Sequence, residues 1–387
     1  MKISDLTSRL QPRGNLLREA AVGRDLQHIE DYLIVDGAAG GLDSLVSLRG
    51  MVADASDSSI KWDGTMAIYW GHDSSGDFYL IPNAQWAKSL VLDKDNLANE
   101  IKNTGRKRPD QTDDDYKEGR NALASKYAAL WDTFENASVG TTDFFKGDIM
   151  FTGKQQPEAN GNYVFTPNKV TYTVNPKGLY GKMSTAEVFV TVHGKAGELG
   201  TSKLTPADSK EVTMLNSTPQ LIALDVQKPT GGIAINTSEI DGAINLVKQN
   251  AAAINAISNF TAPKFTTFKQ ILYNYAVKLG KSHDSLDFDD WLSTSKVSDS
   301  QKLVIAQIQK KPEWKLFWKT FLALKKVKYK VFDQLTKQHG SEVTKTLGII
   351  ANINGKPGGE GYVTSGGKIV NPNFRSAPDN PRFTGEI

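Results

Sequence analysis

The chain has 387 residues and a formal net charge of +3, with 39% hydrophobic and 23% charged residues. This composition is typical of a globular protein, and no apolar run reaches the length of a membrane-spanning helix. The absence of cysteine excludes disulfides, thiolate zinc sites and cysteine nucleophiles. The first twenty residues are too polar for a signal peptide, so we expect a cytoplasmic protein that does not contact membranes.

Strand patterns dominate the first part of the chain. Apolar and β-branched runs predict strands at 59–71, 77–82, 144–152, 162–174, 187–193 and 221–226. Between residues 97 and 136 the pattern is helical and polar, and a charged loop interrupts it.

The pattern changes to helical at residue 238. A capping serine begins the first helix, and further helices are predicted at 265–280, 286–294, 298–310 and 312–338. Strand and turn residues return at 358–371. We therefore predict an α+β fold in which residues 1–237 and 346–387 form one domain, interrupted by a helical insertion at 238–345.

Lys61 lies between Ile60 and Trp62 at the start of a predicted buried strand. A lysine in that place costs stability unless its amine has a use. With Asp63 and Gly64 it forms the tetrapeptide K-x-D-G. Alone, this motif also fits a strand end where the lysine reaches solvent and Asp-Gly makes a turn.

Three later positions add to this motif in a fixed order. Asp148 lies in the strand GDIMF, Glu360 begins E-G-Y-V, and Lys368 follows in GGKIVN. Each has a structural explanation when taken alone: a turn cap, a solvated glycine-rich loop and a surface lysine on an edge strand. Their order along the chain favours a functional interpretation of the set.

Together the motifs resemble the covalent nucleotidyltransferase superfamily of ATP-dependent DNA ligases, RNA ligases and mRNA capping enzymes. The stretches IKWDG, KGDIMF, FTPN and EGYV…KIVN are similar to a group of uncharacterised bacteriophage ligase-like proteins. The resemblance covers residues 59–193 and 358–371 and leaves out the helical insertion. It implies an adenylation domain with antiparallel sheets, ATP and Mg²⁺ as cofactors, and a lysyl-AMP intermediate.

The resemblance also implies roles for single residues. Lys61 would be the nucleophile, and its amine must be neutral to attack, which burial and nearby positive charge favour. Asp148 and Glu360 would hold Mg²⁺, a cation that prefers oxygen ligands. The nucleotide-binding residues expected from the resemblance are Asp63, Gly64, Asp148, Phe165, Glu360 and Lys368.

An aromatic residue that stacks on the base is also expected from the resemblance. Phe165, Tyr172 and Phe189 are candidates, although each also fits core packing. His193 ends an apolar strand, a position where a histidine is more often a core residue than a catalyst.

Two departures from the family pattern bear on the substrate. DNA ligases usually have arginine where this chain has Met66, and only nineteen residues follow Lys368, which leaves no room for an OB-fold. Both observations favour an RNA-ligase-like enzyme over a DNA ligase or a capping enzyme.

The segment from Lys296 to Lys345 is strongly basic. It holds twelve lysines and four acidic residues, a local charge of +8, so the rest of the chain carries −5. The aromatic residues at helical spacing, Trp314, Phe317, Trp318 and Phe321, are predicted to form the insertion's core. Lys325, Lys326, Lys328 and Lys330 are predicted to bind nucleic acid, the alternative being a solvated lysine face.

The sequence thus predicts a monomeric ATP-dependent polynucleotide ligase that joins 5′-phosphate to 3′-hydroxyl ends, with RNA as the favoured substrate. Three alternatives stay open: a DNA nick-sealing ligase of the same chemistry, a non-catalytic nucleic-acid-binding protein, and an adenylyltransferase with another acceptor.

Overall fold

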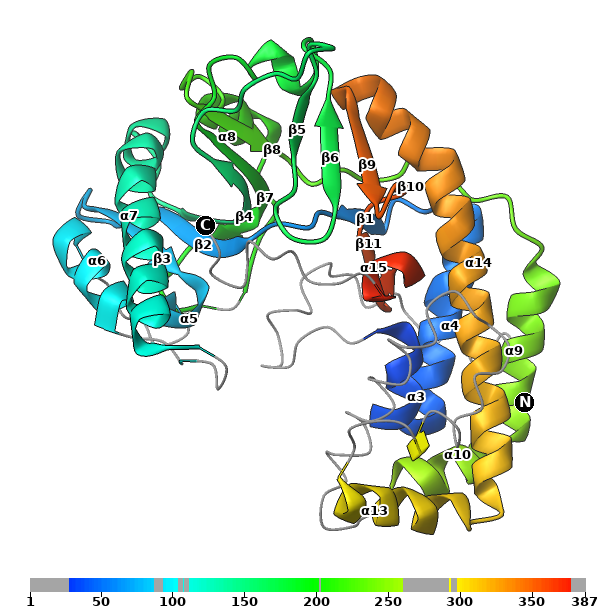
Figure 1. Ribbon diagram of the computed structural model, residues 1–387. Coiled ribbons are helices and arrows are strands. Elements are labelled where there is room, and N and C mark those ends of the chain that lie inside the picture. Colours follow the sequence, from blue (N-terminus) through cyan, green and yellow to red (C-terminus); the bar gives the residue numbers. More distant parts are fainter. Residues whose placement is uncertain are drawn as a thin grey trace.

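The computed structural model describes residues 28–86, 93–103, 107, 111–201, 203–259, 292–293 and 298–376. These residues form three sheets of mostly antiparallel strands with helices on two sides, which confirms an α+β fold with antiparallel sheets (Figure 1). The helices predicted at 265–280 and 286–294 lie almost entirely outside the described residues. None of the described helices is long and apolar enough to cross a membrane.

The largest sheet has five strands in the order β3-β2-β4-β7-β8. Its neighbours pair antiparallel except β7 and β8, which run parallel. The strands are β2 (Met66–His72), β3 (Phe78–Pro82), β4 (Phe144–Thr152), β7 (Val188–Ala196) and β8 (Leu221–Leu224).

Helices cover one side of this sheet (Figure 1). Thr112 begins the longest of them with a capping box to Asp115, which satisfies free N–H groups of the first turn. The helices around the sheet are α5 (Asn83–Trp86), α6 (Lys94–Asn103), α7 (Asp113–Ala137) and α8 (Ser209–Leu215).

A four-stranded sheet has the order β10-β9-β6-β5. The predicted strand at 162–174 is divided, because residues 166–170 form a loop between its two halves. The strands are β5 (Tyr163–Phe165), β6 (Thr171–Val174), β9 (Ile349–Ile353) and β10 (Lys356–Pro357), and η2 (Leu179–Gly181) follows β6.

The smallest sheet joins distant parts of the chain. Its strands are β1 (Ser58–Lys61), β11 (Gly361–Thr364) and β12 (Gly367–Val370), and α15 (Pro372–Ser376) follows. The predicted strand at 59–71 is therefore two strands, since the chain turns at Asp63 and Gly64 and enters a different sheet. In β1 and its partners, Ile60, Tyr362 and Ile369 share one face, and Lys61 and Lys368 lie on the other.

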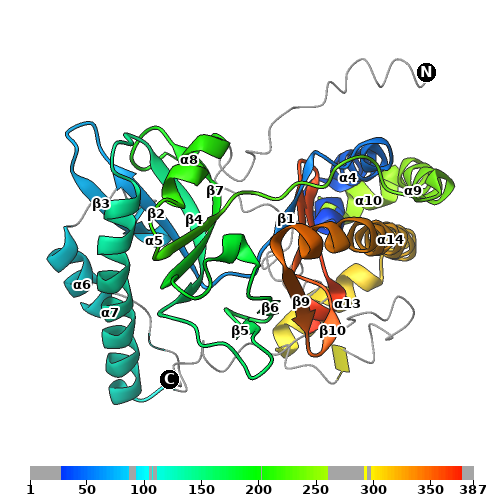
Figure 2. The same ribbon diagram turned by 90° about the horizontal axis from the view of Figure 1, so that it is seen from above.

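The remaining helices form one unit beside the small sheet (Figures 1 and 2). They are η1 (Ile29–Asp31), α3 (Tyr32–Val35), α4 (Gly37–Ala53), α9 (Thr237–Gln249), α10 (Ala251–Ser258), α13 (Asp299–Gln309) and α14 (Glu313–Leu347). Figure 2 looks along α4, α9 and α14, which lie side by side.

The helical unit is built from several parts of the chain, and the predicted domain boundaries stay a prediction. The helices at 29–53, assigned from the sequence to the domain at 1–237, share a core with helices of the predicted insertion at 238–345. Tyr362 and Ile369 of the small sheet belong to the same core. The helical part is therefore not closed on itself, because its core includes residues from both sides of the insertion.

The long helix α14 links this unit to the sheets. Trp314, Phe317 and Phe321 are buried near its start, as predicted, and Trp318 packs against them half-buried. The helix ends where Gly348 adopts a left-handed conformation with φ 64°, which favours glycine. From there the chain enters β9 directly.

Candidate active site around Lys61

Lys61 forms an ion pair with Glu360. The antiparallel pairing of β1 with β11 places Lys61 opposite Gly361, so residues far apart in sequence become neighbours. The distance between Lys61 Nζ and Glu360 Oε2 is 2.9 Å, and the two side chains are 26% and 10% exposed. The lysine of K-x-D-G and the glutamate of E-G-x-V therefore belong to one site, and the amine is partly accessible.

Burial shifts the titration of this glutamate. It raises the pKa of Glu360 from 4.5 to about 7, although Lys61 acts in the opposite direction. The negative charges of Asp63 and Asp148 add to the increase. Two carboxyl groups therefore act on Glu360, and the charge of Lys61 acts on all three.

Asp63 has a structural partner that the sequence did not reveal. Its carboxylate accepts hydrogen bonds from Asn168 Nδ2 at 2.9 Å and from the backbone N–H groups of Lys169 and Val170 at 2.5 and 2.8 Å. Asp63 is only 3% exposed, and its own N–H donates to the Tyr172 hydroxyl. Asp63 thus holds the loop at 166–170 against the turn after Lys61, and its predicted contact with a nucleotide stays a prediction.

Gly64 is explained by close packing. A Cβ atom at this position would lie 2.6 Å from Asp148 Cβ and 3.2 Å from the Ile149 carbonyl oxygen. The next residue, Thr65, donates its N–H to the same carbonyl. Gly64, a nucleotide-binding residue expected from the resemblance, packs closely against β4, which brings Asp148 close to the lysine turn.

Asp148 is paired with His193. The distance from His193 Nε2 to Asp148 Oδ2 is 2.9 Å, and the side chains are 34% and 23% exposed. Burial opposes ionisation of Asp148, but the charges of His193, Lys61 and Lys146 outweigh it and lower its pKa to about 2. Asp148 is therefore a carboxylate at neutral pH.

The assignment of His193 to the core is wrong. A register shift between β4 and β7 leaves this histidine without a directly paired residue on β4, and its ring reaches Asp148. An apolar run in β7 continues up to Val192, and Gly194 directly after His193 is the local sequence sign of the bulge, since glycine inside a strand often marks one.

Phe165 is part of the core. It is 5% exposed and packs against Phe151, Phe189 and Tyr172 at ring-centroid distances of 5.1 to 5.9 Å. The expectation that Phe165 stacks on a base is wrong for this arrangement, because its ring faces are covered by protein.

Lys368 is placed on β12, two strands from Lys61 and on the same face of the sheet. It is half-buried, and it forms an isolated bridge with His28. The role of Lys368 in nucleotide binding stays a prediction.

No group of three or more histidine, aspartate or glutamate side chains within the described ranges could hold a metal ion. Asp148 and Glu360 both lie near Lys61, since the charge of Lys61 lowers the pKa of each. Two carboxylates suit Mg²⁺, which keeps several water or phosphate ligands in most protein sites. The magnesium site stays a prediction.

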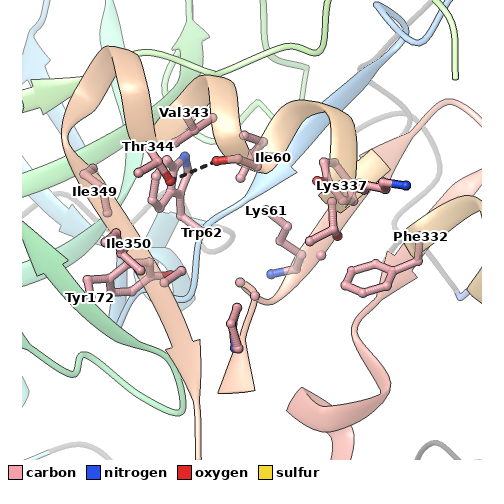
Figure 3. A pocket seen from close by; sticks show the side chains of 18 of the residues that line it. Ile60, Lys61, Trp62, Tyr172, Phe332, Lys337, Val343, Thr344, Ile349 and Ile350 are labelled. Carbon is pink, nitrogen blue, oxygen red and sulfur yellow. Dashed lines mark hydrogen bonds between the residues drawn. The ribbon is translucent and has the colours of Figure 1, made fainter. Parts of the chain in front are cut away.

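A cavity of about 540 Å³ opens beside Lys61 (Figure 3). This volume is within the roughly 300–1,000 Å³ of small-molecule sites. Its walls come from β1 with Trp62, from β6 with Tyr172, from β9 and from the second half of α14. Residues of α14 and the candidate nucleophile Lys61 therefore line the same cavity.

Comparison with known proteins places the chain in a family. Residues 24–372 match a family described as a family of unknown function (DUF6267). The chain belongs to this family. No curated protein and no solved structure matches it.

The lysines predicted to bind nucleic acid do not form one surface in this DUF6267 chain. Lys325 and Lys328 are 2% and 0% exposed, and Lys328 is ion-paired with Glu30, which is itself fully buried. Lys330 is half-buried and pairs with Glu239, while Lys326 is exposed. The prediction of four accessible lysines is therefore wrong for the two buried ones.

Proposed function

We propose that the protein is a covalent nucleotidyltransferase that carries AMP on Lys61 and passes it to a 5′-phosphate. One observation carries the proposal: the amine of Lys61 lies 2.9 Å from the buried carboxyl group of Glu360, at the wall of a cavity. A lysine beside a carboxyl group that readily takes up a proton at neutral pH is a plausible nucleophile in the neutral state.

The reaction begins with the Lys61 lone pair. A bond forms between Nζ and the α-phosphorus of ATP while the bond to the bridging oxygen breaks, and pyrophosphate leaves. Glu360 Oε2 is placed to take the proton that the ammonium group loses. In the next steps a 5′-phosphate oxygen displaces the lysine, and a 3′-hydroxyl then displaces AMP and joins the strand.

Other residues of the site would position these groups. Asp63 and Gly64 fix the turn that carries Lys61 against β4. Asp148, held as a carboxylate beside His193, and Lys368 are candidates for ribose and phosphate contacts. Mg²⁺ bound by Asp148 and the phosphates would stabilise the negative charge that develops on the leaving group.

The finer fold proposal is a ligase-type adenylation domain. RNA is the proposed substrate and nicked DNA the second candidate, because the same chemistry serves both. The motif order and the joining of Lys61 to Glu360 support this proposal over a non-catalytic binding protein.

The test is covalent labelling. The full chain is incubated with Mg²⁺ and ATP or GTP labelled at the α-phosphate, and the denatured protein is examined for acid-labile label. We expect labelling with ATP and release of one pyrophosphate per label. Label from GTP alone would change the nucleotide, and the absence of label from both would reject the proposed function.

A further inference from the structure

The cavity beside Lys61 is built largely by residues outside the ligase-like motifs. Phe332, Thr336 and Gly340 line it from α14, and Ile350 lines it from β9. The polar groups on the other side of Lys61 are absent from this lining, which includes neither Asp148, His193 nor Lys368. The cavity is therefore a separate space that shares Lys61 with the polar site.

The aromatic and apolar side chains that line the cavity favour a ligand with a flat aromatic ring. Trp62, Tyr172 and Phe332 line the cavity although each is at most 5% exposed, whereas Phe165 does not line it. Ile350 is 48% exposed although it is a large apolar residue (Figure 3). Nucleobases stack on such rings whatever their sequence, because every base has a π-face.

A hydrogen-bond donor is left unused in the same wall. The Trp62 indole Nε1 is buried, and it has no hydrogen-bond partner in the part of the chain that the structure describes. A buried donor without a partner costs free energy, so a ligand that supplies an acceptor would be favoured. Ring nitrogens and carbonyl oxygens of a nucleobase are such acceptors.

A row of lysines leads along α14 to this cavity. Lys315, Lys319, Lys326 and Lys337 are exposed, and their spacings of four, seven and eleven residues are close to whole helical turns. Lys337 also lines the cavity. One acidic residue, the exposed Asp333, lies on the same face of α14 as the four lysines. The row spans about 33 Å at 1.5 Å per residue, the scale of a strand of several nucleotides.

We propose that the cavity seats the terminal base of the 5′-phosphorylated strand that accepts the adenylate, with the following phosphates along the lysine row. The proposal rests on the proposed function for the identity of the strand. It places the 5′-phosphate beside Lys61 and assigns α14 a direct part in substrate binding.

Filling the cavity tests the proposal. Gly340 lies on α14 with ordinary helical geometry, and a Cβ there meets only Thr336 Cγ2, at 3.8 Å. Gly340→Leu therefore places a side chain at the cavity without a backbone clash. Gly242→Leu is the matched control, because Gly242 is an exposed glycine on α9 whose Cβ meets nothing within 4 Å.

The probes are a short 5′-phosphorylated RNA and the same RNA with an abasic 5′-terminal nucleotide, both bound to the full chain and followed by fluorescence anisotropy. We expect the parent and Gly242→Leu to prefer the base-bearing end at least about tenfold, a stacking-sized effect. Gly340→Leu should bind both probes alike and keep its self-labelling with ATP. Ile350→Glu, at an exposed position, repeats the test if Gly340→Leu does not fold.

Four results would overturn the proposal. The parent could bind the abasic probe as tightly as the intact one, or not bind RNA at all. The filled variants could retain the preference. They could also lose self-labelling, which would assign the cavity to the adenine of ATP. If the parent prefers the base-bearing RNA but never labels with ATP, the proposed function is rejected, and the proposal that the cavity binds a terminal base is kept.

Discussion

Two lysine–glutamate ion pairs in this protein differ in how far their side chains are exposed. Lys61 and Glu360 meet where two strands pair; Lys61 is 26% exposed and lines a cavity, and Glu360 is 10% exposed. Lys328 and Glu30 meet between α14 and η1, and neither side chain is exposed at all. The same two residue types thus occur once within reach of a ligand and once inside a helical core.

The difference teaches how to interpret a buried charge. A sealed pair has its desolvation cost offset by its partner, and its removal leaves an uncompensated charge in the core. A pair with access to a cavity can exchange its partner for a ligand. We therefore attribute chemistry to Lys61 and architecture to Lys328, and the predictions below test this division.

The largest expected effect is the loss of labelling in Lys61→Met. The substitution removes the only amine that the proposal uses, so covalent label should fall below detection while the thermal transition stays near that of the parent. Labelling with α-labelled ATP and differential scanning calorimetry on the same preparation measure both. A Lys61→Met protein that labels fully would place the nucleophile elsewhere.

Lys328→Met should lower the free energy of unfolding and leave the labelling unchanged, the opposite of Lys61→Met. Removal of one partner leaves Glu30 charged or protonated in the core, and such changes cost roughly 3–5 kcal/mol of unfolding free energy. Denaturant unfolding measures this loss. Label per folded molecule should stay near the parent value.

The matching double variant, Glu30→Leu with Lys328→Met, sharpens this prediction. Replacement of both charges by apolar groups should recover most of the stability, because no unpaired charge remains. A double variant as unstable as Lys328→Met would show that the ion pair itself, and not the unpaired charge, accounts for the loss.

Glu360→Gln should reveal the titration of the accessible pair. The pKa of Glu360 is raised from 4.5 to about 7 in the folded protein, so folding favours its protonated form. Its contribution to stability is complete below pH 4.5 and is lost as the pH rises through 7. Relative to the parent, Glu360→Gln should gain up to ~3 kcal/mol between pH 4.5 and pH 8.

Thermal unfolding of both proteins across that pH range measures the difference. Asp148→Asn is a useful contrast, because the pKa of Asp148 is lowered and its contribution is lost only below pH 3.8. A pH-independent difference for Glu360→Gln would contradict the assignment of a raised pKa.

The smallest effect is expected at Asp63. Asp63→Asn keeps the shape but cannot accept all three hydrogen bonds of the loop at 166–170, which should cost about 1–2 kcal/mol. Hydrogen exchange should show faster opening of that loop, with labelling reduced in proportion. A fall in labelling without a change in loop protection would instead indicate a direct contact of Asp63 with the nucleotide.

The sequence predicted most of the strands, since each is a short apolar run bounded by turn residues. It also assigned Lys61 and Glu360 to one site, because the order of the motifs along the chain can be recognised without a structure. It could not place Asp63 against the loop at 166–170, nor His193 against Asp148, because both contacts depend on how strands are registered.

The lysine-rich helix was the hardest element to interpret. Periodicity identified the aromatic core of α14, but the helix is also covered by residues 29–53, which lie nearly 300 residues earlier in the sequence. That second contact buries Lys328 against Glu30. A buried face made by a distant segment leaves no pattern in the helix itself.

The pairing of β1 with β11 has a consequence for how the protein is made. Residues 61 and 360 are 299 positions apart, and β1 pairs with β11 alone in its sheet. Ribosomes add roughly 5–20 residues per second, so about 15–60 s pass between synthesis of the lysine and synthesis of its glutamate. During that interval the amine has neither its strand partner nor its carboxylate, and a nascent chain released before residue 361 would hold the nucleophile without the means to activate it.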